Sequence, residues 1–274
     1  MMHGAGFLHG HLYSRRVSSG VPERAQSAAR LRALQRRFHP ESEFGGFTDL
    51  DGTLRFYARV RELLPAEGVA LDVGCGRGTQ DEDPVRVRRE LRILRGHCRQ
   101  VIGIDVDPVG AENAFIDEFR LIGGDLSWPV QDAGIDLALA DFVVEHVGDP
   151  DSFFAEAARV IKPGGYLCIR TINVHSYLGV ASRLVPSRLH AATLRRAQPI
   201  RPSEDVFPTV YRCNTRALLA GALDRHGFEA AVYTSETEPS YLTFSSFAYR
   251  LGLLHRRLAP RAFLIGLLAW GRRR

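Results

Sequence analysis

The sequence is poor in cysteine, nearly devoid of lysine and without a long apolar run, and each absence excludes something. The four cysteines, Cys75, Cys98, Cys168 and Cys213, form no C-x-x-C pair, which argues against a zinc site or a redox dithiol. We interpret them as buried thiols of a reducing compartment and expect a cytoplasmic protein. No stretch is long and apolar enough to span a bilayer, and the N-terminus lacks the apolar core of a signal peptide.

Arginine carries almost all of the positive charge, because Lys162 is the only lysine. The net charge is +5 and the isoelectric point is about 9.3, which permits contact with nucleic acid or an anionic membrane without indicating either. Hydrophobic residues make up 45% of the 274 residues, enough for one sizeable core. We therefore expect one main domain with appended segments rather than two full domains.

Short apolar segments alternate with helical patterns through the middle of the chain. Strands are predicted at Val69–Val73, Val101–Ile104, Phe119–Ile122, Ile135–Ala140 and Tyr166–Thr171, followed by two closing strands at Phe228–Ser235 and Tyr241–Phe247. Continuous apolar strands separated by helices indicate a parallel sheet covered on both faces. The pattern predicts an α/β fold of the Rossmann-like, doubly wound type.

The regions around this pattern divide the chain. We expect a disordered N-terminus (1–22), N-terminal helices (23–66), a main domain (67–248) with an irregular insertion (173–212) acting as a substrate lid, and a basic, apolar helical tail (249–274). Within the tail, Ala262–Trp270 is apolar nearly all round and is expected to be helical. It either packs on the domain or lies on an anionic membrane, which would place the protein peripherally at the inner membrane surface.

A glycine-rich turn, "LDVGCGRGTQDEDP", follows the first predicted strand at Leu71–Pro84. Glycines at such a turn let the backbone approach a ligand and adopt positive φ. Dinucleotide folds use G-x-G-x-x-G and place a pyrophosphate at the following helix. Here the order is G-C-G-R-G, and the acids Asp81, Glu82 and Asp83 would repel a pyrophosphate. The turn therefore indicates a cationic ligand without phosphate. The "TQDEDP" segment is either a small lid or a solvated insertion, and we favour the insertion.

Two further acids lie where the next strands end. Asp105 closes "VIGID", where a carboxylate with two acceptor oxygens suits a pair of ribose hydroxyls. Asp125, in "GGDLSWP", is placed to accept a hydrogen bond from an adenine amino group, and Leu126 to cover the ring. Together these residues predict an adenosine-binding end.

With these residues in place, a family resemblance is evident. The motifs "DVGCGRG", "GIDVDP", "GDL", "IDLALADFVVEHVGDP" and "RVIKPGGYLCIRT" resemble, in order and spacing, those of class I S-adenosylmethionine-dependent methyltransferases, most of all the small-molecule type with an E-H-V…D-P segment. The resemblance implies S-adenosylmethionine as cofactor and a seven-stranded sheet whose last strand is antiparallel. It also implies cofactor contacts from Asp72, Gly74, Gly76, Gly78, Asp105, Val106, Asp125, Leu126, Asp141 and Phe142.

Methyl transfer from a sulfonium depends mainly on alignment, and a general base helps when the acceptor is a hydroxyl. His146 and His175 are the candidate bases, with the alternative that His146 only organises its loop by bonding to backbone. Candidate acceptor contacts are Tyr177, His190, Tyr211 and Arg212. No metal site is expected.

The predicted function is S-adenosylmethionine-dependent methylation, at oxygen, of a small-molecule, glycan or lipid-linked acceptor. One alternative is an RNA methyltransferase, although the fourth strand is not followed by the [ND]-P-P-[YF] clamp for adenine amines, and no nucleic-acid partner is expected. The other alternative is a non-catalytic, cofactor-binding partner of another enzyme. The sequence does not indicate the oligomeric state.

Overall fold

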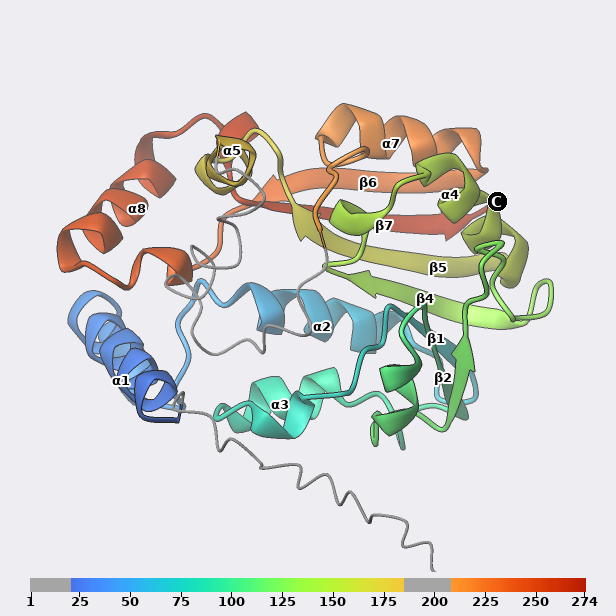
Figure 1. The fold of residues 1–274 in the computed structure, drawn as a ribbon, viewed down its shortest axis with the longest axis horizontal. Coiled ribbons are helices and arrows are strands. Elements are labelled where there is room, and N and C mark those ends of the chain that lie inside the picture. The colour runs from blue at the N-terminus through green and yellow to red at the C-terminus, as the bar shows by residue number, and fades with distance from the viewer. Residues whose placement is uncertain (1–20, 185–207) are drawn as a thin grey trace, which may run out of the picture.

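A single seven-stranded sheet organises the part of the chain that the computed structural model describes, residues 21–184 and 208–274 (Figure 1). Its strands are β1 (Val69–Val73), β2 (Gln100–Asp105), β3 (Glu118–Leu121), β4 (Ile135–Asp141), β5 (Ile161–Ile172), β6 (Phe228–Ser235) and β7 (Gly266–Arg273). The spatial order is β3-β2-β1-β4-β5-β7-β6. Strands β1 to β5 pair in parallel, and β7 pairs antiparallel with both β5 and β6. The predicted doubly wound sheet with an antiparallel last strand is confirmed.

Helices cover both faces of this sheet (Figure 1). The helices of the described residues are α1 (Val21–Phe38), α2 (Gly52–Leu63), α3 (Arg86–Arg92), α4 (Pro150–Val160), α5 (Tyr177–Leu184), α7 (Arg216–Arg225) and α8 (Ser246–Leu258), of which α1, α5 and α8 lie at one end of the molecule (Figure 1). Short 3-10 turns are η1 (Pro40–Glu43), η2 (Gln80–Glu82), η3 (Pro108–Glu112), η4 (Val144–His146), η6 (Ser240–Leu242) and η7 (Arg261–Phe263). Helices α4 and α7 pack on one face, and α2 packs on the other.

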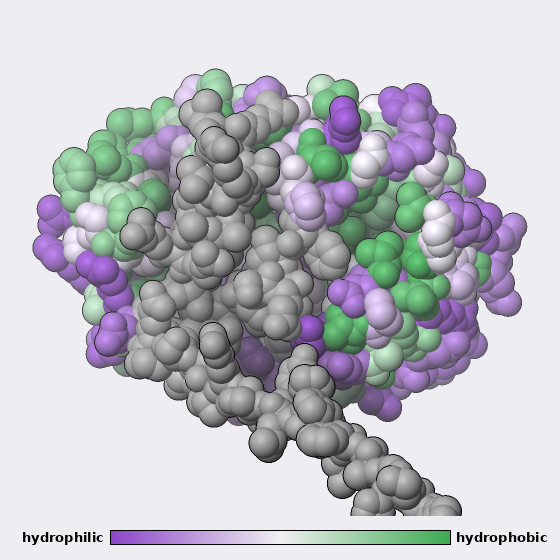
Figure 2. All heavy atoms as spheres, viewed as in Figure 1, coloured by the Kyte–Doolittle hydropathy of each residue, from purple (hydrophilic) through white to green (hydrophobic). Residues whose placement is uncertain are grey.

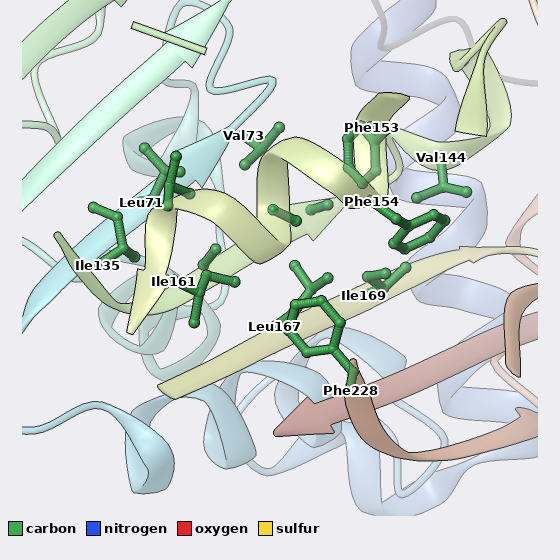
Figure 3. Packing of buried hydrophobic residues seen from close by; sticks show 14 of the residues in the cluster. Leu71, Val73, Ile135, Val144, Phe153, Phe154, Ile161, Leu167, Ile169 and Phe228 are labelled. Carbon is green, nitrogen blue, oxygen red and sulfur yellow. The ribbon is translucent and has the colours of Figure 1, made fainter. Parts of the chain in front are cut away.

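The alternation of side chains along the strands builds one core on each face. On β1, Leu71 points toward the face where Phe154 of α4 packs, and Figure 3 shows this cluster. Ala70 points the other way, toward Phe56 of α2. All four side chains are buried, as expected when successive residues of a central strand face opposite layers. This packing fixes the carboxyl ends of the strands, where the site lies.

Side-chain caps set the start of the helices that flank the site. The Asp51 carboxylate accepts hydrogen bonds from the backbone N–H groups of Thr53 and Leu54, at 2.9 and 3.0 Å, and begins α2. Asp149 caps α4 and is followed by a proline in the first turn. Thr215 caps α7, and Gly227, with a φ of 78°, follows the C-terminal end of this helix.

The C-terminal segment differs from the expectation. Ala262–Trp270 is not a helix, because β7 runs through its second half and lies between β5 and β6. Leu267 and Leu268 contact the cores on opposite faces, so β7 is apolar at successive positions, a pattern that a short buried helix shares. The Trp270 indole packs 5.2 Å from the Phe56 ring and donates a hydrogen bond to the Tyr233 hydroxyl. It is a packing residue of the domain.

Two further expectations meet different outcomes. The strand predicted over Tyr241–Phe247 is wrong, because this segment forms η6 and the start of α8, capped by Ser245. The start of the insertion that we expected to be irregular contains the helix α5. The expected disorder of residues 1–22 falls almost wholly outside the described residues, although Val21 already belongs to α1. Most of the expected lid, including His190, also lies outside them. No helix within the described ranges is long and apolar enough to cross a membrane.

Candidate active site

A cavity of about 910 Å³ lies at the carboxyl ends of β1, β2 and β4. The strand order reverses between β1 and β4, and this switch point is where open α/β sheets bind ligands. The volume is that of a small-molecule or cofactor site. The predicted cofactor residues that line it are Asp72, Gly74, Gly76, Gly78, Asp105, Val106, Leu126, Asp141 and Phe142.

The glycine loop after β1 leaves open space in the cavity. Gly76 has a φ of 52°, and a Cβ built on it would meet no atom within 4 Å. Gly78 is needed for a different reason, because a Cβ there would collide with the side chain of Asn113. Asn113 in turn donates a hydrogen bond to the Cys75 carbonyl at 3.0 Å. The loop is therefore held from the β2 side and open toward the cavity.

Asp105 is held in the site by backbone N–H groups. Its side chain ends β2 and is buried, with one carboxylate oxygen accepting from the Gly76 N–H at 2.9 Å. The other oxygen accepts from the Asp107 N–H, also at 2.9 Å. Each oxygen keeps a second lone pair, so the carboxylate is oriented by backbone and still able to accept from a ligand's hydroxyl groups.

The loop after β3 supplies an apolar wall. Leu126 has a φ of 59°, is 53% exposed and lines the cavity, as does Val106 after β2. Asp125 is exposed, accepts a hydrogen bond from the Ser127 N–H and is not part of the lining. The structure thus brings the predicted ring-covering leucine to the cavity but leaves its neighbouring acid outside.

A buried arginine that the sequence reading missed holds Asp141 at the end of β4. Arg170 on β5 makes a bidentate ion pair with the Asp141 carboxylate, with N–O distances of 2.6 and 2.7 Å. The Tyr57 hydroxyl donates to the same carboxylate at 3.0 Å. The Asp141 carboxylate is therefore held by side chains of the protein itself. A lone arginine inside the apolar run of β5 was the available signal.

Arg170 also shapes the residue after Asp141. Its carbonyl accepts from the Phe142 N–H at 2.8 Å, and Phe142 has a φ of 58°. The guanidinium carbon lies 4.8 Å from the centre of the Phe142 ring and 5.1 Å from that of Phe56. These contacts hold the ring and the backbone of Phe142 in an uncommon conformation against the cavity.

Acidic groups crowd the inner end of the cavity. Burial, with a contribution from the Asp141 carboxylate, raises the pKa of Asp72 to about 7. Burial and the carboxylates of Asp141 and Asp72 raise the pKa of the Tyr57 hydroxyl well above its usual value. The Arg92 guanidinium acts in the opposite direction on the pKa of both groups. A cation in the cavity would relieve this crowding.

The "TQDEDP" segment is not the solvated insertion that we favoured. Asp83 pairs with Arg88 at 2.6 and 2.7 Å, and Arg88 reaches the Asp51 carboxylate at 2.9 Å. The segment is thereby fastened to the residue that caps α2. Gln80 is 9% exposed and lines the cavity, and its Oε1 has no hydrogen-bond partner among the described residues. An acceptor buried in this way is one that a ligand can satisfy.

His146 lines the cavity and has its ring orientation fixed by backbone. Its Nδ1 lies 2.9 Å from the Pro208 carbonyl oxygen, which only accepts, so Nδ1 carries the hydrogen. In the neutral ring the lone pair is therefore on Nε2. The neighbouring carbonyl of Glu145 accepts from the N–H groups of Val210 and Tyr211. The loop after β4 is thus tied to the segment that follows the insertion.

Buried hydrogen bonds also connect the loop after β4 to the segment that follows the insertion. The Thr171 hydroxyl donates to the Glu145 carboxylate at 2.6 Å, and the Asn214 amide donates to the Thr171 oxygen at 2.7 Å. All three side chains are buried. Glu145, from "EHV", is consequently a structural residue that holds η4 in place.

The other candidate acceptor residues lie away from the cavity lining. His175 and Arg212 are exposed. The Tyr177 ring packs edge-on against His255, with centroids 5.3 Å apart, and Tyr211 is buried with a φ of 50°. The cavity wall instead uses Ser240, Tyr241 and Thr243 around η6. They were missed because this segment was predicted as a strand. Across the described ranges, no three His, Cys, Asp or Glu side chains gather as a metal site.

Comparisons with known proteins agree with this geometry. A family model described as a methyltransferase domain matches residues 71–169. The ubiquinone biosynthesis O-methyltransferase of Leptothrix cholodnii is 32% identical over 179 residues, covering 60% of this chain and 72% of that protein. The protein of the same name from Mesorhizobium japonicum is 33% identical over 131 residues, covering 43% of this chain and 47% of its own length.

Solved structures show the same fold. The complex between the Haloferax volcanii Trm112 methyltransferase activator and the putative methyltransferase contains a chain that matches with a TM-score of 0.50 at 17% identity. The match covers 90% of this chain and 96% of that chain. The chain belongs to the class I S-adenosylmethionine-dependent methyltransferases, with S-adenosylmethionine as cofactor.

The residues present fit this cofactor. An oriented carboxylate (Asp105) suits a ribose, an exposed leucine (Leu126) suits a purine face, and the space over Gly76 admits a ligand close to backbone. The acidic inner end around Asp72 suits a sulfonium and an ammonium. The Gln80 Oε1 atom, to which no residue in the described ranges donates a hydrogen bond, offers one more acceptor.

Proposed function

We propose that this enzyme transfers a methyl group to a hydroxyl oxygen of a small or lipid-linked molecule, with His146 as the general base. The oriented Asp105 carboxylate at the carboxyl end of β2 carries the cofactor part of this proposal. The names of the two curated relatives, both O-methyltransferases of ubiquinone biosynthesis, support an oxygen acceptor.

The bound cofactor supplies an activated methyl group on a sulfonium, so the protein must mainly orient the acceptor in line with it. Asp105 would accept from the ribose hydroxyls, and Val106 and Leu126 would enclose the adenine. Phe142, held by Arg170, would form the part of the cavity wall beside the point where the methyl group meets the acceptor. A wall held in this way would exclude water and keep the two reactants aligned.

His146 would take the proton of the acceptor hydroxyl at Nε2. The Pro208 carbonyl selects this tautomer, since it binds the hydrogen on Nδ1. The imidazolium formed after proton transfer keeps the same bond to Pro208. The Glu145–Thr171–Asn214 contacts hold the turn that carries the ring, so the base is positioned by both ends of the insertion.

The amino-acid end of the cofactor would lie between the "TQDEDP" segment and α3. Gln80 and Arg92 both line the cavity, and the Arg92 charge acts on Asp72 at the inner end. Arg92 suits the α-carboxylate, while Gln80 Oε1 and Asp72 suit the α-ammonium. This assignment gives the segment that departs from the family pattern a direct role in binding.

Two cofactor fragments separate this assignment from simple adenosine binding. S-adenosylhomocysteine carries the amino-acid end, and 5′-methylthioadenosine lacks it. We expect Gln80→Leu and Arg92→Met to weaken binding of S-adenosylhomocysteine about tenfold each, the scale of one charge-assisted hydrogen bond. Binding of 5′-methylthioadenosine should be unchanged. Equal losses for both ligands would show that these side chains do not contact the amino-acid end.

The reaction itself is tested by His146→Asn, because an asparagine amide retains a donor toward Pro208 but provides no base. S-adenosylhomocysteine formation with a panel of phenols and catechols should fall at least about 100-fold in kcat. Cofactor affinity and KM should stay near those of the unmodified enzyme. Full activity would remove His146 from catalysis. Stabilisation by NADH with none from S-adenosylmethionine would overturn the whole proposal.

A further inference from the structure

Helix α8 exposes an apolar stripe that no described residue covers. Phe247, Leu251, Leu254 and Leu258 are spaced i, i+4, i+7 and i+11 and therefore lie along one side of the helix. Their exposed fractions are 70, 48, 49 and 73%, against nearly complete burial of Tyr249 on the opposite side. Figure 2 shows hydrophobic residues gathered over this helix. Four large exposed apolar side chains in one row form a patch, unlike the scattered ones usual on a surface.

The charges beside the stripe are all positive. Arg250 and Arg257 are seven residues apart and border the stripe on the same side, and Arg256 follows near the end of the helix. Helix α8 contains no acidic residue. Arg250 lies over the Phe38 ring, and the Arg256 charge acts on the Glu236 carboxylate, where it opposes the rise in pKa that burial causes. Arg250 and Arg257 therefore border the apolar row with positive charge for which helix α8 itself supplies no acidic partner.

The segment that leads into α8 lines the cavity, so the start of this helix lies close to it. Ser240, Tyr241 and Thr243 line the cavity, and the α8 cap, Ser245, follows directly. Helix α8 lies at the end of the molecule that also carries α1 and α5 (Figure 1). A surface bound to α8 is therefore close to η6, which lines the cavity.

We propose that α8 is an interfacial helix that binds an anionic lipid surface, with its four apolar side chains inserted among the acyl chains and its arginines on the headgroups. Its 13 residues are too few to span a bilayer, which takes about 20. A one-sided apolar row bordered by arginine is the pattern of helices that lie in the membrane plane. The charge favours an anionic lipid surface over a neutral one.

This surface deepens the proposed function, on which the following consequence rests. An enzyme held by α8 has η6 close to the bilayer, so the acceptor would be a hydroxyl on a lipid-soluble molecule that reaches the cavity from the membrane. The membrane contact itself does not depend on catalysis and is tested separately.

Sedimentation with vesicles tests the contact directly. The full-length protein should sediment with vesicles of phosphatidylcholine containing about one quarter phosphatidylglycerol, and only weakly with phosphatidylcholine alone. Leu251→Glu combined with Leu254→Glu should reduce partitioning at least about tenfold, because charge replaces inserted apolar groups. Arg250→Gln with Arg257→Gln should weaken binding about fivefold per arginine on anionic vesicles only.

A matched control keeps the test specific. Leu218 on α7 is 53% exposed, and Leu218→Glu should leave partitioning unchanged. Each variant should retain the thermal shift given by S-adenosylhomocysteine, which shows that it is folded. Equal sedimentation of all variants overturns the proposal. The proposal is also overturned if the protein does not bind vesicles but forms a dimer in solution that the α8 substitutions dissociate, because the stripe would then bind a second copy. If the unmodified protein binds vesicles but transfers no methyl group, the result counts against the proposed function alone.

Discussion

The side of the cavity that we propose for the cofactor, around Asp105, and the side that we propose for the acceptor, around His146, are built in different ways. The cofactor side uses residues that directly follow β1, β2, β3 and β4, each within a few positions of its strand. The acceptor side joins segments far apart in sequence, as when His146 Nδ1 lies 2.9 Å from the Pro208 carbonyl oxygen, 62 positions along the chain. The cofactor side is thus defined by local sequence, whereas the acceptor side exists only after the chain has folded.

Arg170 connects the two sides. It belongs to β5, yet its partners are Asp141 at the end of β4 and Thr53 on α2. The difference teaches that local motifs place groups for binding, while long-range buried pairs determine whether those groups hold their geometry. The predictions below separate these contributions.

The largest expected effect is on stability. Arg170→Met leaves the Asp141 carboxylate largely buried without its partner, which should lower the free energy of unfolding by about 3–5 kcal/mol in urea titrations. Arg120→Met removes a bidentate pair of similar geometry at a more exposed place and should cost less than about 1 kcal/mol. Arg170→Met with Asp141→Leu should recover part of the loss. Equal costs for the two single variants would contradict the role given to Arg170.

The next effect is on cofactor affinity. Asp105→Asn replaces an oriented acceptor by an amide, and the dissociation constant for S-adenosylhomocysteine in calorimetry should rise about 10- to 100-fold. Asp125→Asn should change it by less than about twofold, because Asp125 is exposed and outside the cavity lining. A large effect at Asp125 would restore the adenine contact expected from the family pattern.

A smaller effect is expected from pH. Asp72 has a pKa of about 7, so below that pH a cationic cofactor must displace its proton. Affinity for S-adenosylmethionine should therefore rise about tenfold from pH 6 to pH 8 and level off above pH 7. Asp72→Asn should bind more weakly at pH 8 and show little of this dependence. An unchanged pH profile in the variant would assign the titration to another group.

The smallest effect tests the "TQDEDP" segment. Asp83→Ala removes the bond to Arg88 and should loosen Gln80, weakening S-adenosylhomocysteine about threefold with little change for 5′-methylthioadenosine. Asp81 is exposed in the same segment, and Asp81→Ala should bind both ligands normally. Identical behaviour of the two variants would mean that the segment's anchoring does not reach the cofactor.

Sequence reading succeeded for most of the local patterns, although the strand predicted over Tyr241–Phe247 was wrong. The strand from Ile135 was predicted from its apolar run and is β4, and the glycine loop lies at the switch point as expected. It failed for β7, since a strand buried on both faces has no alternation to distinguish it from a short helix. Of the two alternatives for Ala262–Trp270, the structure supports packing on the domain, because its side chains are mostly buried, whereas a row of exposed apolar side chains lies on α8.

By itself, the sequence determined the α/β class, the cofactor and the carboxylate at Asp105, because strand periods and the loops after strands depend on neighbouring residues. Only the tertiary structure decided that Gln80 faces the cavity, that Asp141 belongs to Arg170 and that the Pro208 carbonyl sets the tautomer of His146. These outcomes depend on burial and on partners distant along the chain. The spacing of residues encodes neither the burial of a side chain nor its distant partners, because both are set only when helices and loops pack on the sheet.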